Sequence, residues 1–202
     1  MGLFFKKEKS SEPIDFIIVG LGNPGRKYEG TRHNMGFIAL DMLSEKYKIR
    51  ISRIKFKSLS GTGKIHGKRV LLLKPQTFMN NSGQAVQEVL SFYKLPPSRC
   101  IIIFDEINLA PGTIRIKQKS SDGGQKGMQN IIYLTGSDEF PRIKIGIGSK
   151  PHPDYNLAKW VLSKINAKDV PLLKPALENT LEAVELMISD KIDEAMNKFN
   201  RK

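Results

Sequence analysis

The sequence predicts an α/β protein: a single-domain, three-layer α/β/α sandwich around a mixed twisted sheet. Two observations lead to this fold class. Strand-like apolar segments alternate along the chain with segments of helical periodicity, and a hairpin pattern is inserted among them. With 202 residues the chain can form one domain that buries roughly 70% of its unfolded surface. We place this domain at residues 14–202 and interpret the polar residues 1–13 as a disordered extension.

The first part of the chain predicts a strand, a helix and a hairpin. Residues 16–20 form a short apolar run that ends at a glycine, which is typical of a buried strand. Apolar residues recur near helical spacing over residues 31–47, so a helix should pack on that strand. Residues 53–65 and 68–74 are strand-like and flank His66, which indicates a hairpin with this histidine at its tip.

The middle of the chain predicts a second helix and a central strand. Asn81 or Ser82 can cap a helix that extends to about residue 94, before a pair of prolines. Residues 100–104 are almost entirely apolar, which favours a strand in the centre of the sheet. Cys100, the only cysteine, cannot form an intrachain disulfide, so we expect a buried thiol and a reducing compartment.

The last part of the chain predicts two more strands and a helical end. Residues 113–117 and 142–148 are strand-like, and the glycine-rich residues 119–127 should form a mobile loop before a helix through residues 131–134. Residues 157–199 are mostly helical by pattern, with a proline near the first turn. The packed face expected there consists of Leu172, Leu173, Leu177, Leu181, Val184 and Met187.

The charge balance points to a polyanionic partner. The formal net charge is +13 and the pI is near 9.8, values that favour binding of nucleic acid or of an acidic membrane, although solubility in a basic proteome is the plain alternative. No segment approaches the roughly 18 to 20 apolar residues of a membrane span, and no secretory signal is apparent. We therefore expect a soluble cytoplasmic protein without a membrane partner; a cleaved organellar address in residues 1–13 is the alternative.

A glycine motif near the first strand suggests nucleotide binding, but its context disagrees. Residues 20–25 read GLGNPG and match the GxGxxG fingerprint of dinucleotide-binding folds, in which a helix must begin at once so that its N-terminus meets the pyrophosphate. Here Pro24 and the polar residues 26–30 delay the helix to about Thr31. We interpret the segment as a turn and regard a dinucleotide oxidoreductase as nearly excluded.

Polar side chains follow three of the predicted strands. Asn23 follows the first strand, Asn80 lies after the strand at residues 68–74, and Asp105 ends the strand at residues 100–104. If these strands run parallel, their ends converge at one edge of the sheet, where α/β folds build their sites. His33, at the start of the first helix, should then meet Asn80 and Asp105.

These residue types suit general-base catalysis. A carboxylate behind a histidine fixes the tautomer and stabilises the imidazolium that forms, and asparagine amides can donate to an oxyanion or to a substrate carbonyl. No serine or cysteine is placed as a nucleophile, so water is the expected attacker. Each residue also has a structural alternative: His33 could make a structural hydrogen bond, Asn80 could cap a helix, and Asp105 could cap a turn.

Five ordered motifs resemble those of the bacterial-type peptidyl-tRNA hydrolase family. The segments are VGLGNPG at residues 19–25, TRHN at 31–34, KPQTFMNNSG at 74–83, DE at 105–106 with LAPG at 109–112, and FPRIKIGIG at 140–148. The resemblance covers residues 16–199. It implies a monomeric enzyme without a metal or other cofactor that hydrolyses the ester joining a peptide to the 3′ end of tRNA.

The resemblance also implies roles for single residues. His33 would activate water, and Asp105 would orient the His33 ring. Asn23 and Asn80 would hold the peptide and ester, and Met79 would line the pocket. Tyr28 and Lys126 are further predicted substrate contacts. Lys117 and Lys144 correspond to a pair of basic residues that clamp the tRNA 5′ phosphate in the family; a solvated strand face is their alternative reading.

One segment departs from the family pattern. The family loop commonly reads GGHNG, whereas residues 123–127 read GGQKG and put Lys126 where an asparagine often helps to bind substrate and position water. Some relatives of this fold have become RNA-binding splicing factors, so a non-catalytic RNA-binding module is a second hypothesis. The presence of both His33 and Asp105 argues against it.

Overall fold

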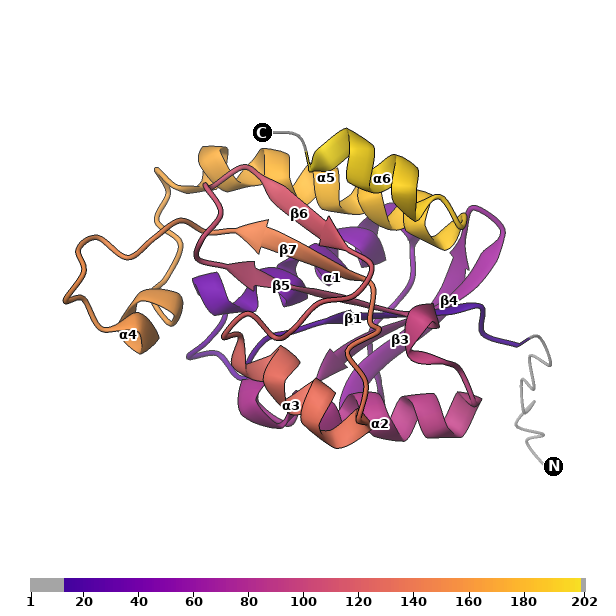
Figure 1. Cartoon of the computed structure of the whole chain (residues 1–202). Helices are drawn as coiled ribbons and strands as arrows, with labels where there is room; N and C mark the ends of the chain where they lie inside the picture. Colours follow the sequence, from indigo (N-terminus) through magenta and orange to yellow (C-terminus); the bar gives the residue numbers. More distant parts are fainter. Residues whose placement is uncertain (1–12, 201–202) are drawn as a thin grey trace, which may run out of the picture.

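A seven-stranded mixed sheet lies between two layers of helices in the computed structural model, which describes residues 13–200 (Figure 1). The predicted fold class is confirmed. Residues 1–12 of the predicted extension lie outside the described residues, so that prediction stays open.

The sheet has the order β2-β3-β4-β1-β5-β7-β6. Its strands are β1 (Phe16–Gly20), β2 (Arg53–Lys55), β3 (Ser58–Ile65), β4 (Lys68–Pro75), β5 (Cys100–Glu106), β6 (Ile114–Lys117) and β7 (Arg142–Gly146). Strands β4, β1, β5 and β7 are parallel to one another. Strand β5, predicted to be central, is an interior strand beside the middle strand β1. The antiparallel pairs are β2 with β3, β3 with β4, and β6 with β7.

Helices cover both faces of this sheet. They are α1 (Met35–Tyr47), α2 (Ser82–Tyr93), α3 (Lys126–Thr135), α4 (Leu157–Val161), α5 (Val170–Ile188) and α6 (Ile192–Phe199). Helices α1, α5 and α6 lie on one face, and α2 and α3 on the other (Figure 1). The short helix α4 belongs to neither layer. It lies beyond the strand ends, on the side toward which the arrowheads of β5 and β7 point.

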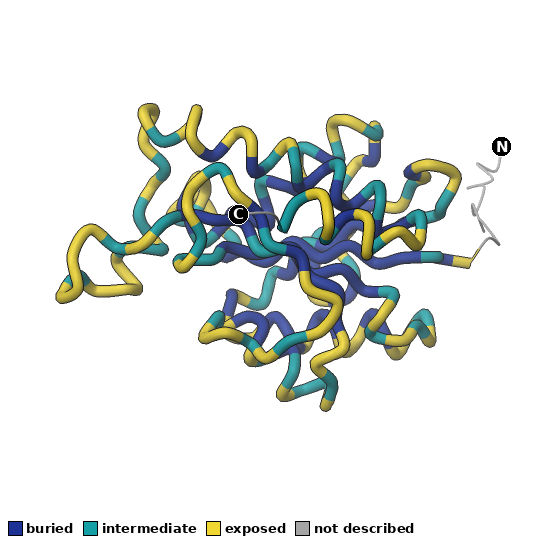
Figure 2. Tube along the Cα trace, turned by 45° about the horizontal axis from the view of Figure 1, so that its top comes forward, coloured by how far each residue is buried: buried dark blue, intermediate teal, exposed yellow. Residues whose placement is uncertain are grey.

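Strand residues alternate between two apolar cores. Ile18, Leu72 and Ile103 pack under α1, α5 and α6, whereas Val19 and Ile102 face α2 and α3. Because side chains in a strand point alternately to opposite faces, a strand that is covered on both sides is apolar throughout. Figure 2 shows the resulting buried band through the centre of the molecule.

The segment at residues 53–65 is two strands, which corrects the single strand predicted there. Phe56 and Lys57 have φ values of 54° and 49° and form the turn between β2 and β3. Phe56 is nevertheless buried, with its ring 5.1 Å from that of Phe92. An apolar residue that is buried from within a turn looks like part of a strand in sequence, which explains the error.

Two helix predictions also need correction. Neither Asn81 nor Ser82 caps α2 with its side chain; instead Asn130, on α3, accepts a hydrogen bond from the Gly83 amide at 2.8 Å. Leu172 is 56% exposed and does not belong to the packed face of α5, whereas Leu173 is buried. The first difference arises from a contact between elements, which local patterns do not encode.

The start of α1 lies directly against the sheet. A Cβ atom at Gly36 would be 2.3 Å from the carbonyl oxygen of Ile103 and 2.4 Å from the amide nitrogen of Leu21, so only glycine permits this approach. Helix α1 begins at Met35, after a 3₁₀ turn at Arg32–Asn34. The helix does not follow the glycine motif immediately, in agreement with the turn interpretation, and the 3₁₀ turn places His33 over the end of β5.

Candidate active site

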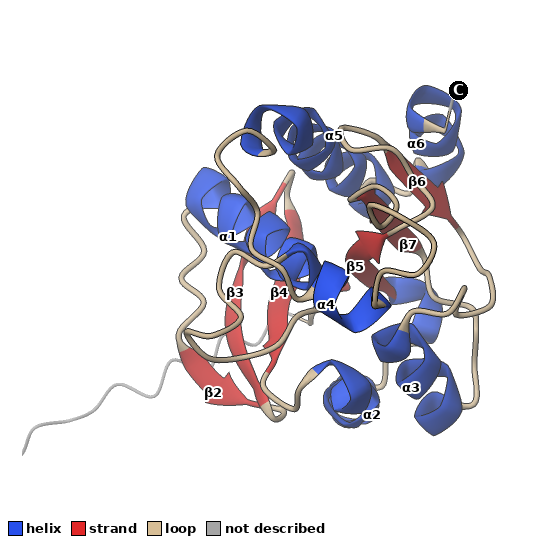
Figure 3. Cartoon of the chain, turned by 90° about the vertical axis from the view of Figure 1, so that its left-hand side faces the viewer, coloured by secondary structure: helices blue, strands red, loops and turns tan. Residues whose placement is uncertain are grey.

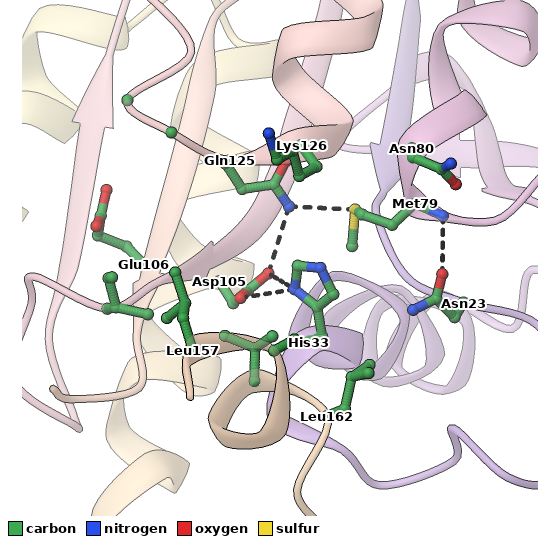
Figure 4. Close-up of a pocket in the computed structure, with 15 residues that line it drawn as sticks. Asn23, His33, Met79, Asn80, Asp105, Glu106, Gln125, Lys126, Leu157 and Leu162 are labelled. Atoms are coloured by element: carbon green, nitrogen blue, oxygen red, sulfur yellow. Dashed lines mark hydrogen bonds and ion pairs between the residues drawn. The ribbon is translucent and has the colours of Figure 1, made fainter. Parts of the chain in front are cut away.

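A pocket of about 680 Å³ opens at the end of the parallel strands (Figure 4). One wall comes from the strand ends and the turns that follow them. The opposite wall comes from α4 and is apolar, with Leu157, Val161 and Leu162, and the glycine-rich loop before α3 closes a third side. The predicted convergence of strand ends is confirmed, because β1, β4 and β5 run parallel.

His33 and Asp105 form a hydrogen-bonded pair in this pocket. Nδ1 of His33 lies 2.9 Å from each carboxylate oxygen of Asp105, and the two side chains are 13% and 3% exposed. An ionised carboxylate only accepts hydrogen bonds, so Nδ1 carries the proton and Nε2 keeps its lone pair. The arrangement can therefore supply a histidine base with a fixed tautomer, next to an apolar cavity.

Hydrogen bonds to Asn34 and Met79 hold Asn23 in place and leave the Nδ2 group of its side chain available to a ligand. Its backbone amide donates to Oδ1 of Asn34 at 2.8 Å, and its backbone oxygen accepts from Nδ2 of Asn34 at 3.0 Å. Its own Oδ1 accepts from the Met79 amide at 2.7 Å. The Asn23 Nδ2 group is directed toward the His33 side of the pocket and is placed to donate to a ligand (Figure 4).

Asn80 lines the pocket but does not approach the His33 and Asp105 pair as predicted. Its amide is turned away from His33 in Figure 4, and its side chain is exposed. The reason lies one residue earlier. The hydrogen bond that the Met79 amide donates to Asn23 fixes the Met79 backbone so that the Met79 side chain takes the inward position, which leaves Asn80 at the rim.

The structure adds Gln125, which sequence reasoning missed. Its Nε2 lies 3.1 Å from Sδ of Met79 and 3.4 Å from Oδ1 of Asp105, while its Oε1 accepts from the Met128 amide at 2.8 Å and caps α3. Gln125 therefore links the carboxylate to the loop that closes the pocket. The loop predicted at residues 119–127 hid this role, because α3 begins at Lys126, inside that stretch, and Gln125 is its N-cap.

Lys126 and Tyr28 lie at or beyond the rim. Lys126 lines the pocket with an exposed side chain, and its Nζ lies 3.4 Å from Oε1 of Gln129. Tyr28 does not line the pocket. It is half-buried and packs edge-to-face on Phe78, with ring centroids 6.2 Å apart.

Lys117 and Lys144 lie on the neighbouring strands β6 and β7. In the strand register Lys117 pairs with Arg142, and Lys144 pairs with Arg115. The two lysines are therefore diagonal neighbours on the same face of the sheet. Lys117 is exposed, whereas Nζ of Lys144 lies 2.9 Å from Oε2 of Glu106. Lys144 is thus ion-paired and only 13% exposed, unlike a solvated strand residue.

The contact with Lys144 also affects the pKa of Glu106. Burial favours the neutral acid and would raise the pKa of Glu106, but hydrogen bonds from Lys144 and Asn108 outweigh burial and hold its pKa below the ordinary range. A phosphate that approached Lys144 would therefore meet a carboxylate already bound to the same amine.

Over residues 13–200, no group of three or more histidine, cysteine, aspartate or glutamate side chains is arranged to hold a metal ion. Within the same residues, none of the helices has both the length and the apolar character that a bilayer crossing needs.

Comparison with known proteins gives a consistent result. The family model described as peptidyl-tRNA hydrolase matches residues 17–202. The chain is 49% identical over 185 residues to the peptidyl-tRNA hydrolase of Caldanaerobacter subterraneus subsp. tengcongensis, covering 92% of this chain and 99% of the relative. It is 46% identical to that of Alkaliphilus oremlandii, with 91% and 98% coverage. The crystal structure of peptidyl-tRNA hydrolase from Acinetobacter baumannii superposes with a TM-score of 0.85 at 36% identity, covering 92% of this chain and 95% of that one.

Proposed function

The chain belongs to the peptidyl-tRNA hydrolase family and is an aminoacyl-ester hydrolase. We propose that its pocket cleaves the ester between a peptide and the 3′ end of tRNA by the mechanism described below. The observation that carries the proposal is the pair formed by His33 and Asp105. It leaves Nε2 of His33 as a proton acceptor beside a cavity.

Water is the nucleophile in this mechanism. Nε2 of His33 takes a proton from a water molecule as its oxygen attacks the ester carbonyl carbon, and Asp105 stabilises the imidazolium that forms. The tetrahedral intermediate then collapses, and the bond between the acyl carbon and the ribose oxygen breaks. The imidazolium returns its proton to that oxygen, so the products are a free peptide acid and tRNA with its hydroxyl restored.

The remaining pocket residues bind the substrate in this proposal. Asn23 Nδ2 donates to the carbonyl oxygen or to the oxyanion that replaces it, because its other polar groups are already occupied. Met79 packs against the peptide, and Asn80 and Lys126 contact the substrate at the rim. Tyr28, with Phe78, would contact parts of the substrate outside the pocket.

A cleavage assay tests the proposed function. Chelator-treated protein with no metal ion added should release free tRNA from N-acetyl-aminoacyl-tRNA, since His33, Asp105 and water carry every proposed step. Tight binding of structured RNA without release would instead identify a non-catalytic RNA-binding protein.

We further propose that Lys117 contacts the tRNA 5′ phosphate together with Lys144. Lys117→Ala should weaken tRNA binding and flatten its dependence on salt by about one phosphate contact, because each neutralised phosphate releases counterions. Binding measured at several salt concentrations gives this slope. Lys174→Ala is the matched control, since Lys174 is 67% exposed on α5 and pairs with Glu178. Equal slopes for all three proteins would remove Lys117 from the interface.

The state of the enzyme is part of the same proposal. We expect residues 14–202 to act as one domain in a monomeric, cytoplasmic protein. The support is that His33, Asp105 and the pocket around them all come from one chain, and that the substrate is a tRNA.

A further inference from the structure

The α4 wall of the pocket has little support of its own. We define the α4 wall as Leu157, Ala158, Val161 and Leu162, the residues of this segment that line the pocket. Helix α4 contains only five residues, none of them buried, and Leu157 and Leu162 are 45% and 38% exposed. In Figure 3 it lies between the two helix layers, in front of the strand ends. Contacts with other parts of the chain must therefore fix the distance between the α4 wall and His33.

The side chain of Arg32 holds this segment. This side chain is 7% exposed, and its Nη1 donates to Oγ of Ser163 at 2.9 Å and to the Lys164 carbonyl oxygen at 2.8 Å. Its Nη2 lies 2.5 Å from Oδ2 of Asp169. The same group stacks on Trp160, with Cζ 4.1 Å from the ring centroid. One side chain thus contacts Trp160 on α4 and three residues between α4 and α5.

Backbone contacts continue this attachment. The Arg32 amide donates to the Ser163 carbonyl oxygen at 3.1 Å, and Thr31 forms a bridge with Lys164. On the other side of α4, Nε1 of Trp160 donates to the carbonyl oxygen of Gly148 at 2.9 Å. Gly148 lies just after the end of β7. The segment is therefore tied both to the 3₁₀ turn that carries His33 and to the sheet.

Arg32 and His33 are consecutive residues of one 3₁₀ turn. His33 contacts Asp105 on β5, whereas Arg32 contacts the segment at residues 160–169. A displacement of the α4 wall relative to the catalytic histidine must break contacts of Arg32. Accordingly the width of the pocket between His33 and the wall depends on this guanidinium.

We propose that Arg32 is a positioning residue that holds the α4 wall at a fixed distance from His33 and thereby favours esterified residues with large apolar side chains. The proposal rests on the proposed function. Its chemical basis is that Leu157, Val161 and Leu162 offer an apolar surface to the pocket, against which a large side chain gains contact and a glycine does not.

Arg32→Lys is the informative variant. Lysine keeps the positive charge and can still pair with Asp169, but a single amine cannot reproduce the planar fork that reaches Ser163, Lys164 and Asp169 while stacking on Trp160. The variant should release the α4 wall without leaving the Asp169 carboxylate unpaired.

The substrates are N-acetyl-phenylalanyl-tRNA and N-acetyl-glycyl-tRNA. For Arg32→Lys the ratio of kcat/KM for the phenylalanyl over the glycyl substrate should fall by on the order of fivefold, mostly through a higher KM for the former. Asp169→Asn, which removes one contact and keeps Arg32, should shift the ratio in the same direction by less. A loss of activity that is equal for both substrates, or an unchanged ratio, would overturn the proposal.

Trp160 supplies a second readout, because it is the only tryptophan in the chain. Acrylamide should quench its fluorescence more strongly in Arg32→Lys and in Asp169→Asn than in the unsubstituted protein. The quenching comparison needs no turnover. If the unsubstituted protein cleaves neither substrate, that result counts against the proposed function, and the quenching still tests whether Arg32 holds the segment. Unchanged quenching in both variants would contradict the attachment.

Arg99→Lys is the matched control. Arg99 also stacks on an aromatic ring, 4.6 Å from the Phe16 centroid, and pairs with Asp190 at 2.7 Å, but it lies before β5 and does not line the pocket. Its replacement should leave both the substrate ratio and the quenching unchanged. If Arg99→Lys shifts the substrate ratio and the quenching as much as Arg32→Lys does, the loss of any arginine produces the effect and the proposal is wrong.

Discussion

Replacing His33 with alanine should lower kcat for ester cleavage by on the order of 10²-fold or more, because the reaction loses its general base. The structure gives the reason in atoms: Nδ1 donates to Asp105, so Nε2 is the basic nitrogen beside the cavity. Water would then attack without a partner to take its proton. Release of free tRNA under saturating substrate measures this rate.

A second histidine serves as the control for this prediction. His66 lies at the tip of the hairpin between β3 and β4, and its half-exposed side chain faces Glu185 across 3.8 Å. His66→Ala should cleave at the unsubstituted rate. Cleavage by His33→Ala at that same rate would exclude His33 as the base.

Replacing Asp105 with asparagine should have an effect of similar size, on the order of 10²- to 10⁴-fold in kcat. An asparagine can donate a hydrogen bond to Nδ1 of His33, which shifts the ring proton to Nε2 and removes the lone pair that water needs. The side chain hardly changes in volume, so the pocket should keep its shape. The comparison of kcat with substrate affinity separates lost chemistry from lost binding.

Asp41→Asn is the control for the carboxylate. Asp41 is 62% exposed and pairs with Lys74 on the surface, so its replacement removes a charge without touching the pocket. It should leave kcat unchanged. If Asp105→Asn also kept full activity, the carboxylate would have no part in orienting His33, and the base would need another explanation.

The strand ends could be predicted because the signals for them are local. The apolar runs around Ile18, Leu72 and Ile102 alternate with helical patterns, which implies parallel strands with a common C-terminal edge. The meeting of His33 with Asp105 follows from that edge, and the structure confirms it at 2.9 Å. The roles of both residues remain predictions until the rates are measured.

The orientation of individual side chains could not be predicted in the same way. Asn80 turns outward because Asn23 fixes the backbone of the preceding residue. Lys144 is paired because Glu106, distant in sequence, lies on the neighbouring strand. Each of these arrangements depends on a partner brought near by folding, and neither periodicity nor residue type indicates which partner that will be.

The contacts of Arg32 show the same limit. Its motif is visible in the sequence, but its hydrogen-bond partners lie more than 130 positions away, on a segment whose pattern indicates only a helix. A five-residue helix that covers a pocket leaves almost no signal in periodicity. The wall of the site is therefore a property of the folded chain.

The double variant of His33→Ala with Asp105→Asn tests the central claim most directly. If Asp105 acts only by orienting and stabilising the ring of His33, its replacement should cost nothing more once that ring is gone. We predict that the double variant cleaves N-acetyl-aminoacyl-tRNA at the rate of His33→Ala alone. Losses that multiply, so that the double variant is slower by the product of the two single effects, would show that the two side chains act independently and would contradict the mechanism.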